Sequence, residues 1–61
     1  MKMYKIEFID WCGQVHIKTY KGINLAIKKS FDICGFYKNV KCWCEENGNI
    51  IKVILEVKKQ S

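Results

Sequence analysis

The chain has 61 residues, which suffices for one domain over residues 1–61 and is too short for a second. Lysine and arginine total 11 against 6 acidic residues, so the formal charge is +5, and apolar residues make up 49% of the chain. This balance is typical of a folded soluble domain and excludes a disordered chain. No apolar run reaches the roughly 18 residues of a membrane-spanning helix, and the alternating N-terminal residues do not resemble a signal peptide. We therefore expect a cytoplasmic protein with no membrane contact.

The composition also indicates an origin. All 11 basic residues are lysine, and nine isoleucines stand against two leucines. This bias is typical of an AT-rich genome, and with the small size and basic charge it favours a phage or a mobile element. Lysine contacts phosphate as a point charge and lacks the planar fork of arginine.

The N-terminal third of the chain predicts a β-hairpin. Apolar and polar residues alternate over residues 3–10 and again over residues 15–20, a period of two that is typical of half-buried strands. Cys12 and Gly13 fit a two-residue turn between them, with the glycine supplying a positive φ. The resulting cross-strand partners are Glu7 with Lys18, Phe8 with Ile17, and Ile9 with His16.

The central segment predicts a helix over residues 24–34. Apolar residues recur there at helical spacing. Asn24 is a candidate N-cap, and Gly35 followed by Phe36 fits a left-handed C-cap. The face expected to pack on a sheet carries Ile23, Ala26, Ile27, Ser30, Phe31 and Cys34.

Asn47–Gly48 is the strongest local signal in the chain, because a type I′ turn needs a positive φ at both of its central residues. It predicts a second hairpin, whose last strand covers residues 50–57. Trp43 then lies opposite Lys52 and faces away from the core. The other partners are Val40 with Leu55, Cys42 with Val53, and Cys44 with Ile51.

These elements predict a single α+β domain in the order strand, strand, helix, strand, strand. The first and last strands are the most apolar, so we expect them parallel and adjacent at the centre of a four-stranded mixed sheet, in the order 2-1-4-3. The helix packs on one face. In layout and length this resembles the β-grasp immunoglobulin-binding domains of protein G over the whole chain, but no motif is shared and no binding activity is implied. A different strand order is the alternative.

Four cysteines raise the question of a metal site or disulfides. The spacings Cys12-x3-His16 and Cys42-x-Cys44 differ from the C-x2-C pair of a zinc knuckle. We therefore expect Cys42 and Cys44 to be reduced core residues, with no metal and no other cofactor. A nucleophile pair of Cys12 and His16 lacks a cleft and oxyanion donors, and no glycine-rich phosphate loop is present. The sequence thus predicts no catalytic residue and no enzyme.

The sheet face turned away from the helix, called here the open face, is the predicted interaction surface. Trp43, Ile54 and Ile9 are expected to form an apolar strip there, which Trp11 and Tyr37 extend. Apolar strips rimmed by charge often mark interaction sites, and aromatic residues are frequent anchors. The predicted partner-binding residues are Trp43, Ile54, Ile9, Tyr20, His16, Lys18, Lys41 and Lys52.

The favoured hypothesis is a small non-enzymatic interaction protein of a phage or mobile element that binds and inhibits a host or element protein, including proteins of host defence. A homodimer through paired open faces would use the same strip. The alternative is a nucleic-acid-binding accessory protein, with bases stacking on aromatic rings and lysines contacting phosphates. Glu7, Glu45 and Glu56 on the same face weaken that alternative, and a steep salt dependence of binding would identify it.

Overall fold

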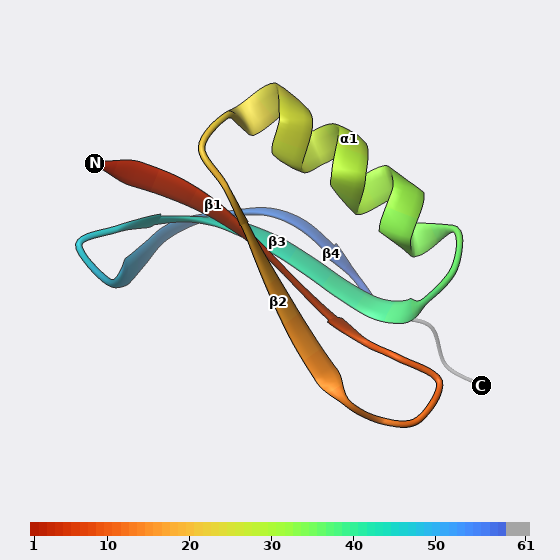
Figure 1. The fold of residues 1–61 in the computed structure, drawn as a ribbon. Helices are drawn as coiled ribbons and strands as arrows, with labels where there is room; N and C mark the ends of the chain where they lie inside the picture. Colours follow the sequence, from red (N-terminus) through yellow and green to blue (C-terminus); the bar gives the residue numbers. More distant parts are fainter. Residues whose placement is uncertain (59–61) are drawn as a thin grey trace.

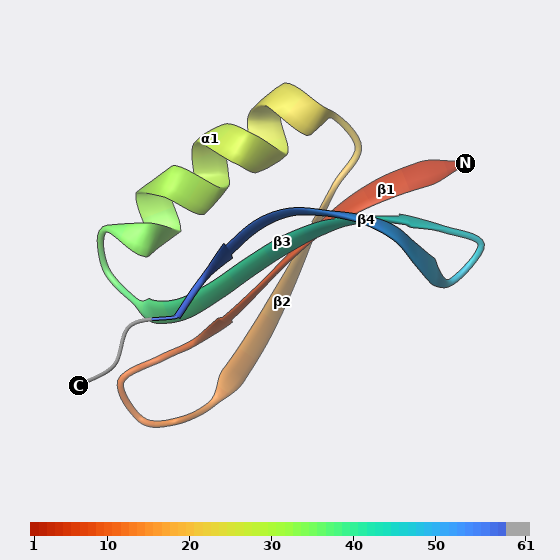
Figure 2. The same ribbon diagram turned by 180° about the vertical axis from the view of Figure 1, so that it is seen from behind.

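The computed structural model describes residues 1–58, which form a two-layer α+β domain. The elements are β1 (Lys2–Ile9), β2 (Val15–Tyr20), α1 (Ile23–Cys34), β3 (Lys38–Glu46) and β4 (Asn49–Val57). The helix α1 lies over one face of the sheet and leaves the other face open (Figures 1 and 2). The α+β class and the element order are confirmed. Within the described residues, no helix is long and apolar enough to cross a membrane.

The strand order corrects the expected β-grasp arrangement. The sheet runs β2-β1-β3-β4 and every neighbouring pair is antiparallel, so the order 2-1-4-3 and the mixed sheet are wrong. Apolar content misled the prediction, because residues 49–53 of β4 are exposed although most of them are apolar. A strand that is buried on both faces belongs at the centre of a sheet. The strand β3 meets this condition, with Val40, Cys42, Trp43 and Cys44 buried.

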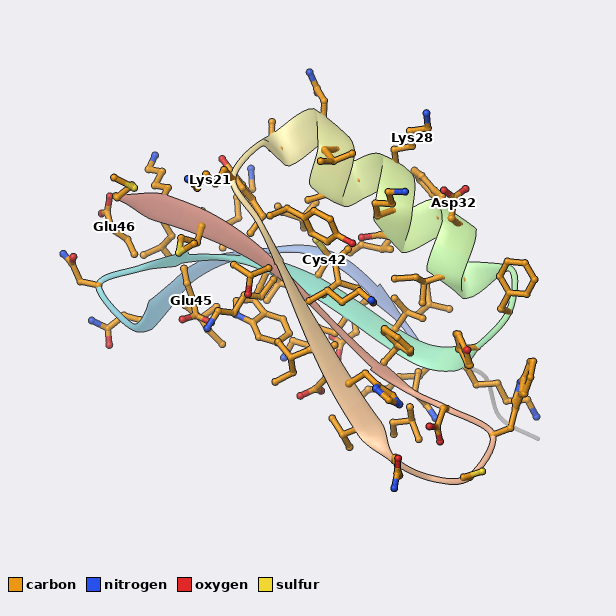
Figure 3. The ribbon with its side chains drawn as sticks, in the orientation of Figure 1. Lys21, Lys28, Asp32, Cys42, Glu45 and Glu46 are labelled. Atoms are coloured by element: carbon orange, nitrogen blue, oxygen red, sulfur yellow. The ribbon has the colours of Figure 1, made fainter. Side chains whose placement is uncertain are left out.

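The core lies between α1 and the sheet. It is formed by Ile6, Phe8, Ala26, Val40 and Cys42, and Figure 3 shows Cys42 beneath the helix. Cys44 is also buried, and both residues carry free thiols, as the sequence predicted.

The helix α1 begins one residue earlier than expected, and its caps differ from the prediction. The N-cap is Gly22, which has extended backbone and no side-chain hydrogen bond, so Asn24 lies inside the helix. Gly35 has a φ of −72° and is not left-handed; its N–H donates to the carbonyl of Asp32. Phe31, which was expected in the core, is 62% exposed.

The first hairpin has a longer connection than the two-residue turn that the sequence predicted. The N–H of Gly13 donates to the carbonyl of Asp10 at 3.0 Å, and the N–H of Asp10 donates to the carbonyl of Gln14 at 2.9 Å. Gly13 has a φ of 86°. This is the pattern of a three-residue loop, in which a type I turn is followed by a left-handed glycine. The connection shifts the strand pairing by one residue.

A one-residue shift turns every side chain of β2 to the other face of the sheet. Phe8 pairs with His16, and Ile6 pairs with Lys18. His16, Lys18 and Tyr20 therefore lie on the helix side, and their predicted place on the open face is wrong. The open face of β2 carries Val15, Ile17 and Thr19 instead.

The Asn47–Gly48 turn is confirmed. The φ angles of these residues are 53° and 81°, and Glu46 pairs with Asn49 across the turn. The predicted register holds only next to the turn, because β4 contains two register shifts beyond it.

The two shifts are β-bulges that redirect the side chains of β4. Trp43 pairs with Val53 and Cys44 pairs with Lys52, so Lys52 lies on the helix side and not opposite Trp43. Ile54, the extra residue of the second bulge, packs against the core and not on the open face. Both residues were predicted on the open face, and both predictions are wrong.

The turn glycine gives the first testable prediction. Gly48→Ser should lower the free energy of unfolding by about 1 kcal/mol, because a residue with a Cβ atom resists the left-handed backbone conformation. The matched control is Gly22→Ser, at an extended position with open space around it, where serine is a favourable N-cap. Urea unfolding followed by circular dichroism measures both variants. Equal midpoints for the two variants would contradict the prediction.

Candidate interaction site

Trp43 lies on the open face as predicted, but its ring is covered by its own chain. The residue is 7% exposed. Its indole N–H donates to Oε2 of Glu45 at 2.7 Å, and Nζ of Lys5 lies 3.4 Å from Oε1 of the same carboxylate. Nζ of Lys41 lies 5.9 Å from the ring centroid. The ring and its donor are satisfied within the domain, so Trp43 forms a small second core and not an exposed anchor.

The apolar strip expected from the sequence therefore does not form. Of the eight predicted site residues, the open face holds Ile9, Lys41 and Trp43, while Ile54, His16, Lys18, Tyr20 and Lys52 lie on the helix side. The exposed aliphatic residues of the open face are divided between its two edge strands, with Val15 and Ile17 on β2 and Ile50 and Val53 on β4.

Aromatic residues instead gather where the β1–β2 loop meets the segment after α1. Four rings follow one another from the sheet to the surface. The ring of His16 stacks on Phe8 with centroids 5.1 Å apart, and Phe8 stacks on Tyr37 at 4.8 Å. Tyr37 then meets the ring of Trp11 at 5.3 Å. Trp11 is the outermost ring of this series and is 80% exposed.

The indole N–H of Trp11 is already satisfied inside the domain. It donates to the carbonyl of Phe36 at 3.1 Å, and Phe36 is itself 68% exposed. An indole buried in an interface normally needs a partner for this donor. Here a covering surface would meet two apolar rings without leaving the donor unpaired. We call Trp11 and Phe36 the aromatic tip.

The loop that carries Trp11 is held in place by Asp10. Oδ1 of Asp10 accepts hydrogen bonds from the N–H groups of Cys12 and Gln14, both at 2.9 Å. Oδ2 lies 2.7 Å from Nε2 of His16. The hydrogen bond with His16, followed by that from Gln14, lowers the pKa of Asp10 below its ordinary 3.8. Asp10 was not among the predicted site residues, although aspartate at the first position of a turn that ends in glycine is a known signal.

Two adjoining hollows connect the aromatic tip to the open face, and we call them the trough. Both include Ile9 and Asn39. Asn39 has a φ of 57° and lies at a bulge where β3 has one residue more than β1. The first hollow, of about 270 Å³, adds Asp10, Trp11 and Lys38. The second, of about 230 Å³, adds Glu7, Val40, Lys41, Glu56, Val57 and Lys58.

Polar groups in this region pair with one another within the domain. Lys58 lies 3.7 Å from Glu56 within the trough, and Nε2 of His16 faces Asp10. In residues 1–58, no three His, Cys, Asp or Glu side chains are grouped so that they could hold a metal ion. Cys12, which is exposed, lies in the loop beside Trp11.

No protein family, no curated protein and no solved structure matches this chain.

The two tryptophans give the second prediction. Trp43→Ala should lower the free energy of unfolding by about 3 kcal/mol, because it removes a buried ring and leaves a cavity. Trp11→Ala, the same change at an exposed ring, should cost about 1 kcal/mol or less, since it removes one hydrogen bond and one ring contact. Urea unfolding compares them. Equal losses would show that Trp43 is not a core residue.

The third prediction concerns pH. The pKa of Asp10 is lowered in the folded chain, so the stabilisation from its carboxylate is fully present above about pH 4 and is lost as the pH falls through the lowered pKa. Asp10→Asn should therefore be less stable than the wild type at neutral pH, and the difference should narrow toward about pH 2. Urea midpoints at constant ionic strength measure this, with Asp32→Asn on α1 as the control. A difference that stays constant with pH would contradict the role of Asp10.

Proposed function

We propose that this chain is a small non-enzymatic protein-binding factor that holds one partner protein through the aromatic tip and the trough. The observation that carries this proposal is the aromatic tip, where Trp11 is 80% exposed while its N–H is bonded to Phe36. Tryptophan is among the most frequent interface anchors. An anchor on a loop that is already ordered loses little conformational entropy on binding, and the three hydrogen bonds to Asp10 order this loop.

The charges of the trough favour a protein partner over a nucleic acid. Lys38, Lys41 and Lys58 line it together with Glu7, Asp10 and Glu56. A nucleic-acid groove gathers cations along the backbone path, whereas alternating signs suit complementary pairs with a protein surface. The burial of Trp43 also removes the reason for the homodimer through paired open faces, since that ring needs no further cover.

The composition supports a biological origin for this proposed binding factor. The lysine-only, isoleucine-rich chain supports an origin in a phage or mobile element of an AT-rich host. In this setting the partner is a cytoplasmic protein of the host or of the element. A domain of 61 residues that binds a partner acts by covering part of the partner's surface. The proposed effect is therefore inhibition. Defence proteins of the host are among the proposed targets.

Affinity capture from the source cells tests this function. Tagged wild type, Trp11→Ala and Leu25→Ala are compared, because Leu25 is an exposed apolar residue of α1 outside the tip and the trough. Wild type and Leu25→Ala should retain the same partner after nuclease treatment. Trp11→Ala should weaken binding by about 2 kcal/mol, roughly 30-fold.

Two results would contradict the proposal. Capture that is equal for Trp11→Ala and Leu25→Ala would show that the aromatic tip is not the anchor. Binding that disappears with nuclease and falls steeply with salt would instead support the nucleic-acid alternative.

A further inference from the structure

A second apolar surface lies on the helix side of the sheet. α1 and β4 enclose a hollow of about 240 Å³, lined by Ile27, Ser30, Phe31, Ile54 and Leu55, which we call the α1–β4 groove. The hydroxyl of Ser30 donates to the carbonyl of Ala26 at 2.7 Å, so it is not available to a ligand as a free donor. Phe31 projects beside the groove and is 62% exposed. The groove is apolar and carries a large apolar side chain at its rim.

We propose that the α1–β4 groove binds a second copy of this chain, with the two α1 helices antiparallel about a two-fold axis. In such an interface each copy presents the same surface to the other. Phe31 and the groove lie next to each other on one chain. When the two-fold axis passes between Ile27 and Phe31, Phe31 of each copy lies against Ile27 and the groove of the other. One surface then supplies both the projecting side chain and the hollow that receives it.

The charges on the helix agree with this arrangement. Lys28 and Asp32 extend from the side of α1 that is turned away from the sheet (Figure 3), and they are one helical turn apart. When the axis passes near residue 30, Lys28 of each copy comes opposite Asp32 of the other. Contact of Phe31 with Ile27 needs an axis at almost the same position. The apolar contact and two reciprocal charge pairs are therefore compatible with one register.

The free edge of β4 does not favour an added strand as the occupant. Strand addition depends on a continuous row of backbone hydrogen bonds. β4 contains bulges at Ile51 and Ile54, the second of which lies beside the groove, and bulges at a sheet edge oppose such pairing. A helix that inserts side chains needs no hydrogen bonds from this edge.

The expected dimer is weak. An aromatic side chain covers about 200 Å², so the two Phe31 side chains contribute about 400 Å², which is small beside the roughly 1,600 Å² of a standard interface. Each copy also carries a net charge of +5. Salt screens this repulsion between exposed charges, so we expect association to strengthen when the salt concentration rises from low to moderate values.

Charge reversal tests the register directly. Lys28→Glu places carboxylates opposite each other at both pairs, and Asp32→Lys places ammonium groups opposite each other at both pairs, so each variant alone should dimerise about tenfold more weakly than the wild type. In an equimolar mixture the two introduced charges are opposite in sign and meet across the interface, while the native pair remains. The mixture should regain wild-type association, measured by sedimentation equilibrium up to about 1 mM.

Three further measurements complete the experiment. Circular dichroism verifies that both variants are folded, and Phe31→Ser should weaken the dimer without rescue by either variant. Trp11→Ala should dimerise as the wild type does, which separates this inference from the partner-binding function of the aromatic tip. A wild type that stays monomeric at every concentration would overturn the proposal. So would a mixture that associates no more strongly than the single variants, or a dimer whose association is unchanged by both charge reversals.

Discussion

The burial of Trp43 on an uncovered sheet face is the constraint on which the rest of this structure depends. A domain with one helix and one sheet can cover only one face of the sheet. On the other face Trp43 is buried by its neighbours: Nζ of Lys41 lies over the ring, Glu45 accepts the indole N–H, and Lys5 forms an ion pair with the same carboxylate. Lys5 can do this only because it is the cross-strand partner of Trp43, which requires β1 to lie beside β3. The central position of β3 and the edge position of β4 follow.

Features that depend on a few neighbouring residues could be predicted from the sequence. The boundaries of β2, the start of α1 to within one residue and the Asn47–Gly48 turn are of this kind. The strand order is not, because it depends on which side chains cover Trp43, and these come from different strands. The bulges of β4 likewise cannot be predicted from a simple alternation of apolar and polar residues, since each bulge adds one residue and reverses the alternation beyond it.

The candidate site shows how one residue in a loop changes a surface. The sequence places His16 and Tyr20 on the open face only if the first turn has two residues; the longer loop puts both on the helix side. The segment Asp10–Gly13 contains the signal of a type I turn, with aspartate first and glycine fourth. The aromatic tip had no such signal. Trp11 and Phe36 are 25 positions apart, and only the tertiary fold brings them into contact.

The two proposed surfaces do not compete for the same residues. The trough opens on the sheet face turned away from α1, through Glu7, Lys41 and Glu56, while the α1–β4 groove lies on the helix side. A two-fold dimer through the groove would therefore leave the trough of each copy, with Trp11 at its end, accessible. Two tips increase the apparent affinity only for a partner that is itself repeated, because the second contact then becomes intramolecular. For a monomeric partner the weak dimer does not raise the apparent affinity, and a single aromatic tip must supply the anchor.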